Sequence, residues 1–595
     1  MDRNFLLAFL LSTLAIFVYY TLFPPQQPEV IPEGEQQQLE QKAEEEGEAS
    51  SQPVKTITEA ESKDPVSSEI GAVSRTTVNI ETNLYRAEID SQDGSLTRLL
   101  LKKYQYATEP HFNITEFVID LFTGSDEEEV PYDPDRRVNM AGEVSDQNRI
   151  WKVFPDGGDA TVNFQVSEES MTVTSQPRTL EMKAVLPSGL VEHKQVTFYP
   201  DSYQIDLEVR LINHTGEQKT LSPEVNFGAG GEAIAGETLP QPKVAITYID
   251  EDFDKYDGDD AEEQPVTFSD TSFAGQMDKY FIHAVKTADE KPFDGRLTAL
   301  KSSLDGNELL VPKFTYVDEP VQLANNQEYS RKFQIYAGPK IETEMEAFHY
   351  ELRNAMDLGW FEILARPLLS LLRWLQSYVV NWGVAIILLT IIVRSAMLPL
   401  AFKGMTSMRK MQALSPKINK LREKYKGNKE RMNQEIMKFY SQHKVNPMGG
   451  CLPMALQIPI FIALYQALLP AIELRHTPFF LWWSDLSAAD YTMVLPLLMG
   501  VTMFAQQSLT PVPAMDPTQA KIMKWMPVMM VLFFLNMPSG LVLYWVVSNV
   551  ISVGQQLIFN KVAPRPQAEE QPKGKGDAKT PAKSPAKGKQ SKKSK

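Results

Sequence analysis

The chain has 595 residues, which is too long for one compact domain and enough for two or three. Its single cysteine, Cys451, excludes a disulfide framework and a metal cluster built on cysteine. The net charge of −17 is unevenly distributed: residues 403–446 hold 12 Lys/Arg against 3 Asp/Glu, and residues 561–595 hold 11 against 3. Two basic segments in an otherwise acidic chain are typical of a protein with parts on both sides of a membrane.

The N-terminus carries an apolar segment, residues 4–23, that is long enough to cross a bilayer. No cleavage site of small residues follows it, so residues 1–23 are predicted to remain as a signal-anchor span. Residues 24–72 are rich in Pro, Glu, Gln and Ser and have too little apolar surface to offset the loss of chain entropy on folding. We expect them to form a disordered tether.

Residues 73–345 have the pattern of β-strands. Apolar and polar side chains alternate through residues 203–211, and Asp93-Gly94 is typical of a tight turn. Such signals recur along the segment and predict a large extracytoplasmic antiparallel β-sandwich. A structural or docking role is favoured over an enzymatic one, because the segment contains no HExxH, CxxC, phosphate-binding glycine loop or Ser/His/Asp order.

Residues 346–380 are predicted to form connecting and amphipathic helices. Between residues 363 and 379 the leucines recur every three or four positions, as on one face of a helix. Arg366 and Arg373 lie off this face and make the segment a poor membrane span. We expect it to lie in the membrane interface, with Trp374 at the level of the lipid headgroups.

Residues 381–560 contain further apolar segments. Five more spans are expected, at residues 382–402, 448–471, 491–509, 522–537 and 540–559. With the N-terminal anchor the total is six, which places both chain ends on the same side. The basic segment 403–446 and the basic tail 561–595 then both face the cytoplasm, as the positive-inside rule requires.

The first of these five spans contains a charged residue, Arg394. It lies nine residues before Lys403, about 13 Å along a helix and therefore near the bilayer midplane. No Asp or Glu lies in the apolar cores of the later spans, so this arginine is expected to face a polar cavity and to be available to an incoming negative charge. The alternative is that the span ends at Arg394 and the following segment lies along the membrane surface.

Other polar residues accompany Arg394 in the predicted spans. Individually such residues are more often hydrogen-bond donors and acceptors between helices than parts of a site. Together with an arginine they are expected to line a hydrated groove that opens to one side. They are Thr390, Gln457, Gln466, Thr502, Gln506, Gln507, Ser548, Asn549 and Ser552.

The basic segment 403–446 is predicted to be a hairpin of two antiparallel helices that turns at Gly427-Asn428. Two interpretations of its charge remain open, a solvated face near anionic lipid and a docking surface. The residues expected to carry docking are Arg409, Lys410, Lys417, Lys420, Arg422 and Lys424. The basic tail 561–595 has low complexity and would attract lipid or RNA without specificity.

Several segments resemble the YidC family of membrane protein insertases in its Gram-negative form. They are IVRSAMLPL, VNPMGGCLPMALQIPIFIALYQAL, LPLLMGVTMFAQQ and PSGLVLYWVVSN, and the N-terminal anchor followed by a large β-sandwich resembles that form as well. The resemblance implies that residues 381–560 are a five-span insertase core. It also implies that the protein inserts membrane proteins and helps them fold, alone or with the Sec translocon.

The family also implies a mechanism. A groove opens to the cytoplasm and to lipid and is closed on the outer side, and its arginine, which matches Arg394, attracts acidic or polar segments of substrates. Thr390 and Tyr544 match positions that face the substrate path. Trp545 stands where a tyrosine is usual, which keeps an aromatic ring and puts in doubt any role that needs a hydroxyl group. The apolar faces of the third and fifth spans would guide the substrate's own span.

The resemblance places the protein in the bacterial inner membrane and implies its partners. These are nascent integral membrane proteins, the Sec translocon, SecD/SecF, components of the signal recognition particle, the ribosome through the basic tail, and the bilayer itself. No cofactor, catalytic residue, metal or DNA partner is expected. A polytopic transporter with an extracytoplasmic binding domain is the alternative, but we find no inverted repeats or broken helices in corresponding positions. A membrane enzyme would need a nucleophile or metal constellation, which we do not find either.

Overall fold

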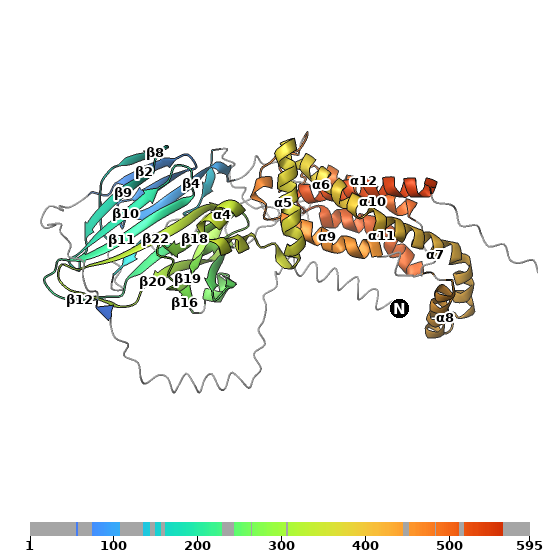
Figure 1. Cartoon of the computed structure of the whole chain (residues 1–595), viewed down its shortest axis with the longest axis horizontal. Helices are drawn as coiled ribbons and strands as arrows, with labels where there is room; N and C mark the ends of the chain where they lie inside the picture. The colour runs from blue at the N-terminus through green and yellow to red at the C-terminus, as the bar shows by residue number, and fades with distance from the viewer. Residues whose placement is uncertain are drawn as a thin grey trace, which may run out of the picture.

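The computed structural model describes residues 55–56, 74–106, 135–142, 149–155, 161–228, 243–262, 264–304, 307–443, 445, 452–481, 483–510 and 517–562. The predicted anchor 1–23, the tail beyond residue 562 and Cys451 lie outside these residues. So does the predicted tether, except for Lys55 and Thr56. Strands occupy the first half of the described chain and helices the second (Figure 1).

The first half is a β-sandwich that contains one large sheet. This sheet has the order β15 (Asp252–Tyr256), β14 (Val244–Ile249), β17 (Phe273–Met277), β18 (Phe281–Thr287), β22 (Glu328–Pro339), β11 (Gln204–Asn213), β10 (Leu190–Phe198), β9 (Arg178–Val185) and β7 (Gln165–Val166). Its strand pairs are all antiparallel.

Three smaller sheets complete the sandwich. One has the order β16 (Val266–Thr271), β19 (Phe293–Leu304), β20 (Asn307–Val317), β13 (Glu224–Gly228) and β6 (Val153–Phe154). Another has the order β5 (Arg137–Asn139), β4 (Ser95–Gln105), β3 (Tyr85–Asp90), β2 (Thr77–Thr82) and β8 (Ser170–Val173). The third has the order β1 (Lys55–Thr56), β21 (Val321–Leu323) and β12 (Lys219–Leu221), so two residues of the predicted tether pair with the sandwich. The predicted β-sandwich is therefore confirmed, and it is antiparallel except for the pairs β2 with β8 and β1 with β21 in its smaller sheets. The short 3-10 helix η1 (Asp259–Ala261) follows β15.

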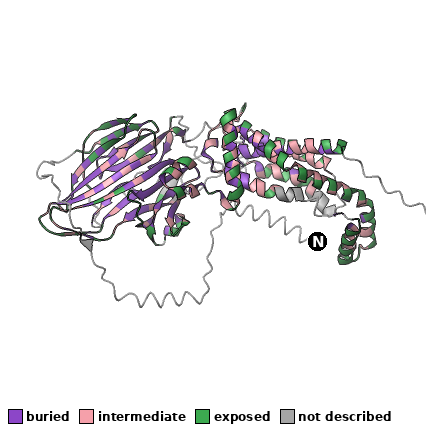
Figure 2. Cartoon of the chain, in the orientation of Figure 1, coloured by how far each residue is buried: buried purple, intermediate pink, exposed green. Residues whose placement is uncertain are grey.

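The alternating pattern along the strands produces the core. In β11 the side chains of Ile205, Leu207, Val209 and Leu211 are buried while the residues between them are half-buried, as the sequence predicts. Figure 2 shows the same alternation of buried and exposed residues across the sheets. The two faces of β11 therefore separate core from solvent, whereas β17 and β18 are buried on both faces.

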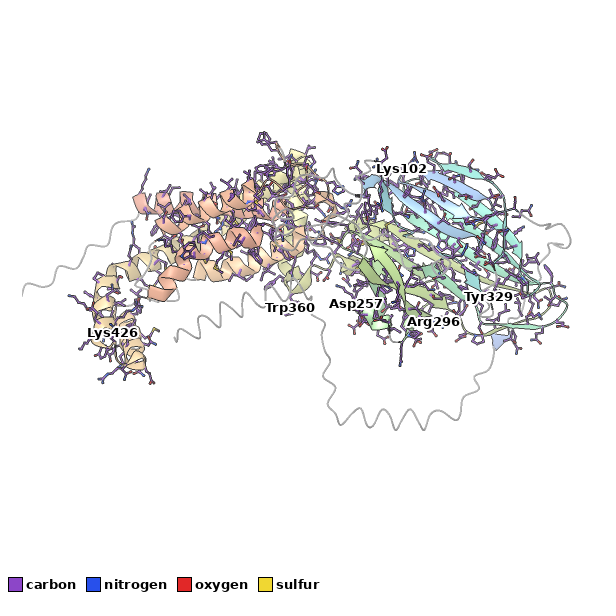
Figure 3. All side chains as sticks on the ribbon, turned by 180° about the vertical axis from the view of Figure 1, so that it is seen from behind. Lys102, Asp257, Arg296, Tyr329, Trp360 and Lys426 are labelled. Atoms are coloured by element: carbon purple, nitrogen blue, oxygen red, sulfur yellow. The ribbon has the colours of Figure 1, made fainter. Side chains whose placement is uncertain are left out.

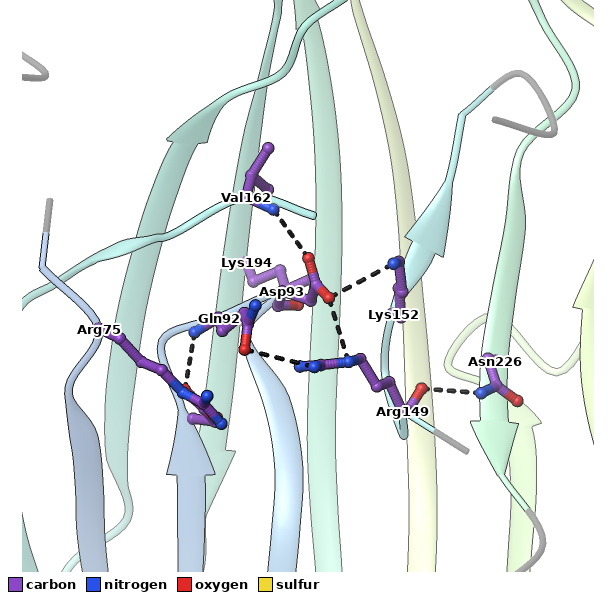
Figure 4. Close-up of polar contacts among 9 residues, drawn as sticks. Arg75, Gln92, Asp93, Arg149, Lys152, Val162, Lys194 and Asn226 are labelled. Atoms are coloured by element: carbon purple, nitrogen blue, oxygen red, sulfur yellow. Dashed lines mark hydrogen bonds and ion pairs between the residues drawn. The ribbon is translucent and has the colours of Figure 1, made fainter. Parts of the chain in front are cut away.

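Charged residues are buried behind the turn between β3 and β4 (Figure 4). Asp93 has a φ of 60°, and its carboxylate accepts a hydrogen bond of 2.9 Å from the Val162 amide and lies 3.4 Å from Lys152 and 3.5 Å from Arg149. The Lys194 ammonium donates to the Asp93 carbonyl at 2.5 Å. Since buried charges need such partners, the cluster serves to fix this strained turn.

The sandwich is joined to the helical half by short helices. They are α4 (Glu342–Phe348), η2 (Tyr350–Met356) and η3 (Gly359–Phe361), followed by the longer α5 (Glu362–Val379). On α5 the side chains of Ala365, Leu369, Leu372 and Leu375 are buried, while Trp374 is 56% exposed. The amphipathic helix expected here is confirmed, and it lies across the direction of the helices that follow (Figure 1).

The remaining helices form a bundle with a projecting hairpin. They are α6 (Trp382–Ala396), α7 (Leu398–Lys424), α8 (Lys429–Gln442), α9 (Leu452–Leu468), η5 (Ile472–Leu474), α10 (Val494–Leu509), α11 (Pro517–Phe534) and α12 (Ser539–Val562). The hairpin of α7 and α8 and the β-sandwich lie at opposite ends of the molecule (Figure 1).

A membrane span over residues 382–402 was expected, with an end of the span at Arg394 as the alternative, and the helix is not continuous over this range. The helix breaks at Met397, and α7 is bent by 59° from α6. Pro399 explains the break, because proline has no N–H to donate to the preceding turn and its ring clashes with a continuing helix. Hydropathy alone could not predict this break, because apolar residues continue after it.

Among the described residues, only α12 is long and apolar enough to qualify by itself as a membrane span. The bent pair α6 and α7 qualifies when taken as one span. The apolar parts of α9, α10 and α11 are shorter, at residues 457–468, 494–509 and 523–534. The predicted spans after the anchor thus each overlap one helix, except that residues 382–402 extend over the bent pair α6 and α7, and the described helices do not by themselves establish the number of spans.

Candidate functional site

Arg394 lies in the last turn of α6 and is directed at α12. Its Nε donates a hydrogen bond of 2.6 Å to the hydroxyl of Ser548, and a second guanidinium nitrogen contacts the same oxygen. The side chain is only partly buried. In the described part of the chain Arg394 forms no ion pair with a carboxylate, and its side-chain hydrogen bonds go to a neutral hydroxyl group, which does not neutralise its charge.

A polar face runs along α12 from this point. Tyr544, Ser548, Ser552 and Gln556 are spaced by four residues and therefore lie on one side of the helix. The Tyr544 hydroxyl accepts a hydrogen bond of 2.7 Å from Gln457 of α9. This face brings four predicted site residues together: Arg394, Ser548, Tyr544 and Gln457.

The amide oxygen of Gln457 is buried and has no hydrogen-bond partner among the described residues. A buried acceptor without a donor is costly unless water or a ligand supplies one. The same Gln457 side chain donates to Tyr544, so this acceptor belongs to the group of residues that includes Arg394. The site therefore offers a cation and a free acceptor close to each other.

Two predicted residues bond elsewhere. Thr390 is fully buried, and its hydroxyl donates to the carbonyl of Ile386 in its own helix at 2.6 Å. Asn549 donates to the hydroxyl of Thr502 on α10 at 3.3 Å. The contacts of Thr390 and Asn549 are therefore hydrogen bonds within one helix and between two helices, respectively.

Trp545 belongs to an aromatic cluster. Its ring lies 4.6 Å from that of Phe461 on α9 and 5.1 Å from that of Phe534 on α11. These contacts pack three helices together. The replacement of a hydroxyl-bearing tyrosine by tryptophan at this position is compatible with such packing.

The end of the bundle near the sandwich is covered by the outer loop, which we define as residues 472–493 and which the structure describes except for residue 482. The carbonyl of Phe479 accepts a hydrogen bond of 3.1 Å from Asn381, the N-cap of α6. At the start of α12, the Gly540 amide donates to Leu486 at 2.9 Å and the Ser539 hydroxyl donates to Asp485 at 2.7 Å. The loop thus holds the first turns of the two helices that carry Arg394 and Ser548.

The hairpin is built as expected. Met411, Ile418, Tyr440 and Val445 form a small buried cluster in its seam, and Asn428 caps α8 by accepting from the Arg431 amide at 2.9 Å. The remaining surface of the hairpin is mostly exposed (Figure 2), and Lys426 lies at its tip, in the turn between α7 and α8 (Figure 3).

The predicted docking residues of the hairpin differ in exposure. Lys410, Lys417, Lys420 and Lys424 are exposed, whereas Arg409 and Arg422 are half-buried. The guanidinium of Arg409 lies 5.1 Å from the ring centre of Phe559 on α12, a cation–π contact at the root of the hairpin. Arg409 therefore attaches the hairpin to the bundle in addition to any docking role.

Sequence reasoning missed two features of the site. Gln556 is buried on the polar face of α12, and its spacing of four from Ser552 could have revealed it. Arg475 is buried in the outer loop and belongs to no periodic pattern in the sequence that would have indicated its burial.

Comparisons with known proteins agree with this architecture. Residues 77–371 match the family model described as the YidC periplasmic domain, and residues 374–566 match the model described as 60Kd inner membrane protein. Together these matches define a bacterial inner-membrane protein with a large periplasmic β-domain. The chain belongs to the YidC family of membrane protein insertases.

Individual relatives match over most of their length. The membrane protein insertase YidC of Syntrophus aciditrophicus is 38% identical over 82% of this chain and 85% of its own, and that of Geotalea uraniireducens is 33% identical over 95% and 100%. Among solved structures, an active YidC insertase with its first transmembrane domain resolved aligns over 92% of this chain and 98% of its own, at 16% identity and a TM-score of 0.34.

Proposed function

We propose that this protein inserts integral membrane proteins into the bacterial inner membrane and assists their folding, alone or with the Sec translocon. The observation that carries the proposal is Arg394, a cation without a carboxylate partner among the described residues, placed between the two helices α6 and α12. A transporter or pump would normally pair such a charge with a buried acid. Insertion needs no cofactor and no catalytic residue.

The proposed topology has six spans with both chain ends in the cytoplasm. The separation of the sandwich from the basic hairpin along the molecule supports placing them on opposite sides of the membrane (Figure 1). The orientation of α5 across the bundle, with Trp374 and Tyr378 exposed, supports its position in the outer interface. Trp360, at the start of this region, is exposed as well (Figure 3).

The depth of Arg394 in the membrane can be estimated by counting residues from Trp382, at the start of α6. It lies twelve residues after Trp382, about 18 Å along the helix, in a hydrocarbon layer about 30 Å thick. The bend at Met397 removes the estimate based on Lys403. This second estimate supports a position of Arg394 within the membrane, toward its cytoplasmic half. A charge at that depth favours access of water from the cytoplasm.

In the proposed mechanism, Arg394 attracts the acidic tail of a substrate in a hydrated groove, and the Gln457 amide oxygen accepts a hydrogen bond from an N–H or O–H group of the tail. The tail then has a shorter apolar distance left to cross. Exposed apolar residues of α11, which are Trp525, Val528 and Leu532, would guide the substrate's own span together with α9. The outer loop would close the groove on the periplasmic side.

The proposed partners are those that the family resemblance implies, and the exposed charge supports two of them. The lysines of the hairpin would dock components of the signal recognition particle or the translocon, and the tail 561–595 would attract the ribosome. Contacts with SecD/SecF are expected outside the groove. The β-sandwich would serve as a structural or docking domain.

The test uses matched substrates that differ only in the charge of the translocated tail. Arg394→Ala is expected to reduce insertion of acidic tails about tenfold or more and to affect neutral tails little, because a charge-assisted contact contributes about 1.5–3 kcal/mol. Arg394→Lys retains more activity than Arg394→Ala, since it keeps the charge. An equal loss for acidic and neutral tails would show that Arg394 serves structure or hydration.

A further inference from the structure

A chain of ion pairs connects the sandwich to the helical half. Glu342, in the helix that follows the last strand, contacts both arginines of α5: Arg366, and Arg373 at 2.6 Å. Arg373 also pairs with Glu473 of the outer loop at 2.8 Å. All four side chains are between 16% and 26% exposed, which limits screening by solvent.

Two residues further along the outer loop, Arg475 contacts the sandwich itself. Its guanidinium donates to the main-chain carbonyls of Gln105 at 2.8 Å and Tyr106 at 3.0 Å, just where β4 ends. It also lies 5.7 Å from the ring centre of Tyr280 and 5.6 Å from that of Phe281. The residue is 7% exposed, so these contacts hold its charge inside the joint.

From Arg475 the chain continues into residues whose hydrogen bonds lead to the groove helices. The next residue, His476, donates its amide to Asp485 at 3.1 Å, and Leu486 donates to Thr477 at 3.0 Å. Asp485 and Leu486 in turn accept from the first two residues of α12, as described above. Phe479, in the same loop, binds the N-cap of α6.

We infer that Arg475 is a positioning residue that fastens the β-sandwich to the outer loop and thereby keeps the outer ends of α6 and α12 closed over the groove. Its acceptors are main-chain carbonyls, so the contact depends on the position of strand β4 rather than on particular side chains there. Placement of the sandwich and closure of the groove are then coupled through Arg475, beside the ion pairs that join Glu342, Arg373 and Glu473. The inference rests on the proposed groove.

Hydrogen exchange of the full chain in lipid nanodiscs tests this coupling without measuring insertion. Arg475→Gln is expected to accelerate exchange of the amides of residues 485–487, 539 and 540 about tenfold, because two charge-assisted hydrogen bonds are lost. Arg475→Lys is expected to accelerate exchange to an intermediate extent, since lysine keeps the positive charge but has fewer hydrogen-bond donors. The matched control is Arg178→Gln, at an arginine of the sandwich surface that pairs with Glu168 and lies outside the joint.

A second variant acts from the sandwich side. Phe281→Leu keeps apolar volume but removes an aromatic face beside Arg475, and it is expected to accelerate the same amides to a smaller extent. Combined with Arg475→Gln, it adds little further acceleration. Unchanged exchange in the outer loop of Arg475→Gln would overturn the inference, and so would acceleration spread equally over strands β10 and β11. Because insertion is not the readout, failure of this inference is distinguishable from failure of the proposed function.

Discussion

Arg394 and Ser548 are 154 positions apart in the sequence, yet their side chains form the central contact of the site. Ser548 holds the guanidinium without neutralising it, which leaves the charge available to a substrate. A carboxylate at this position would compete with the acidic tail. The pairing of an arginine with a neutral hydroxyl therefore fits a site that binds an anion transiently.

Ser548→Ala is expected to lower insertion of acidic tails about fivefold, since a neutral hydroxyl partner of a buried charge contributes about 1 kcal/mol. The loss is smaller than that of Arg394→Ala, and the double variant is no worse than Arg394→Ala alone because both act through one contact. Ser370→Ala on α5 is the matched control, as its hydroxyl bonds to the backbone of its own helix outside the groove. Additive losses in the double variant would show that Ser548 acts independently of Arg394.

The periplasmic domain contains a buried histidine that makes its stability depend on pH. Burial, and then the charge of Lys243, lower the pKa of His283 to about 4. The unfolded state binds a proton near pH 6.5, whereas the folded state does not until about pH 4. Stability is therefore present above pH 6.5 and falls as the pH drops through this window, by up to about 3 kcal/mol.

His283→Gln is expected to make the unfolding midpoint of the sandwich less dependent on pH between 6.5 and 4. Thermal unfolding of the full chain in detergent, followed at pH 7 and at pH 4.5, measures the change. His193, whose pKa is also lowered to about 4 by burial and by Arg210, accounts for part of the remaining slope. An identical slope in the variant and the unchanged protein would show that His283 does not contribute.

At the scale of elements, the docking of α5 on α9 depends on one glycine. Gly359 has a φ of 61°, and a Cβ built there would lie 2.1 Å from the amide nitrogen of Gln466. The amide oxygen of Gln466 accepts from Phe361 at 3.4 Å, so the same side chain anchors the turn before α5.

Gly359→Ala is expected to destabilise the helical half by about 1–2 kcal/mol, because an L-residue is strained in the left-handed region. The matched control is Gly554→Ala on α12, where an added Cβ meets no atom within 4 Å and the helix gains propensity. Thermal unfolding in detergent measures both variants. A Gly359→Ala protein as stable as the control would contradict the assigned role of this turn.

The sequence predicted elements whose signals are local. The period of two in β11, the Asp93-Gly94 turn and the amphipathic α5 all follow from residues close together in the chain. The bend before Pro399 was missed because apolar residues continue beyond it. Contacts between distant segments, such as Arg409 with Phe559 or Arg475 with β4, leave no periodic signal and could not be predicted.

At the scale of the whole molecule, three parts lie in series. The sandwich is fixed to the outer loop, the loop covers the outer ends of α6 and α12, and the basic hairpin extends at the other end (Figure 1).

The central claim is that this chain inserts proteins into a bilayer. The most direct measurement uses the purified full-length chain in liposomes, a short single-span substrate with an acidic tail, and protection of that tail from external protease. We predict protection in liposomes that contain the protein, well above that in liposomes without it. Equal protection in both, with the protein correctly folded and oriented, would contradict the account.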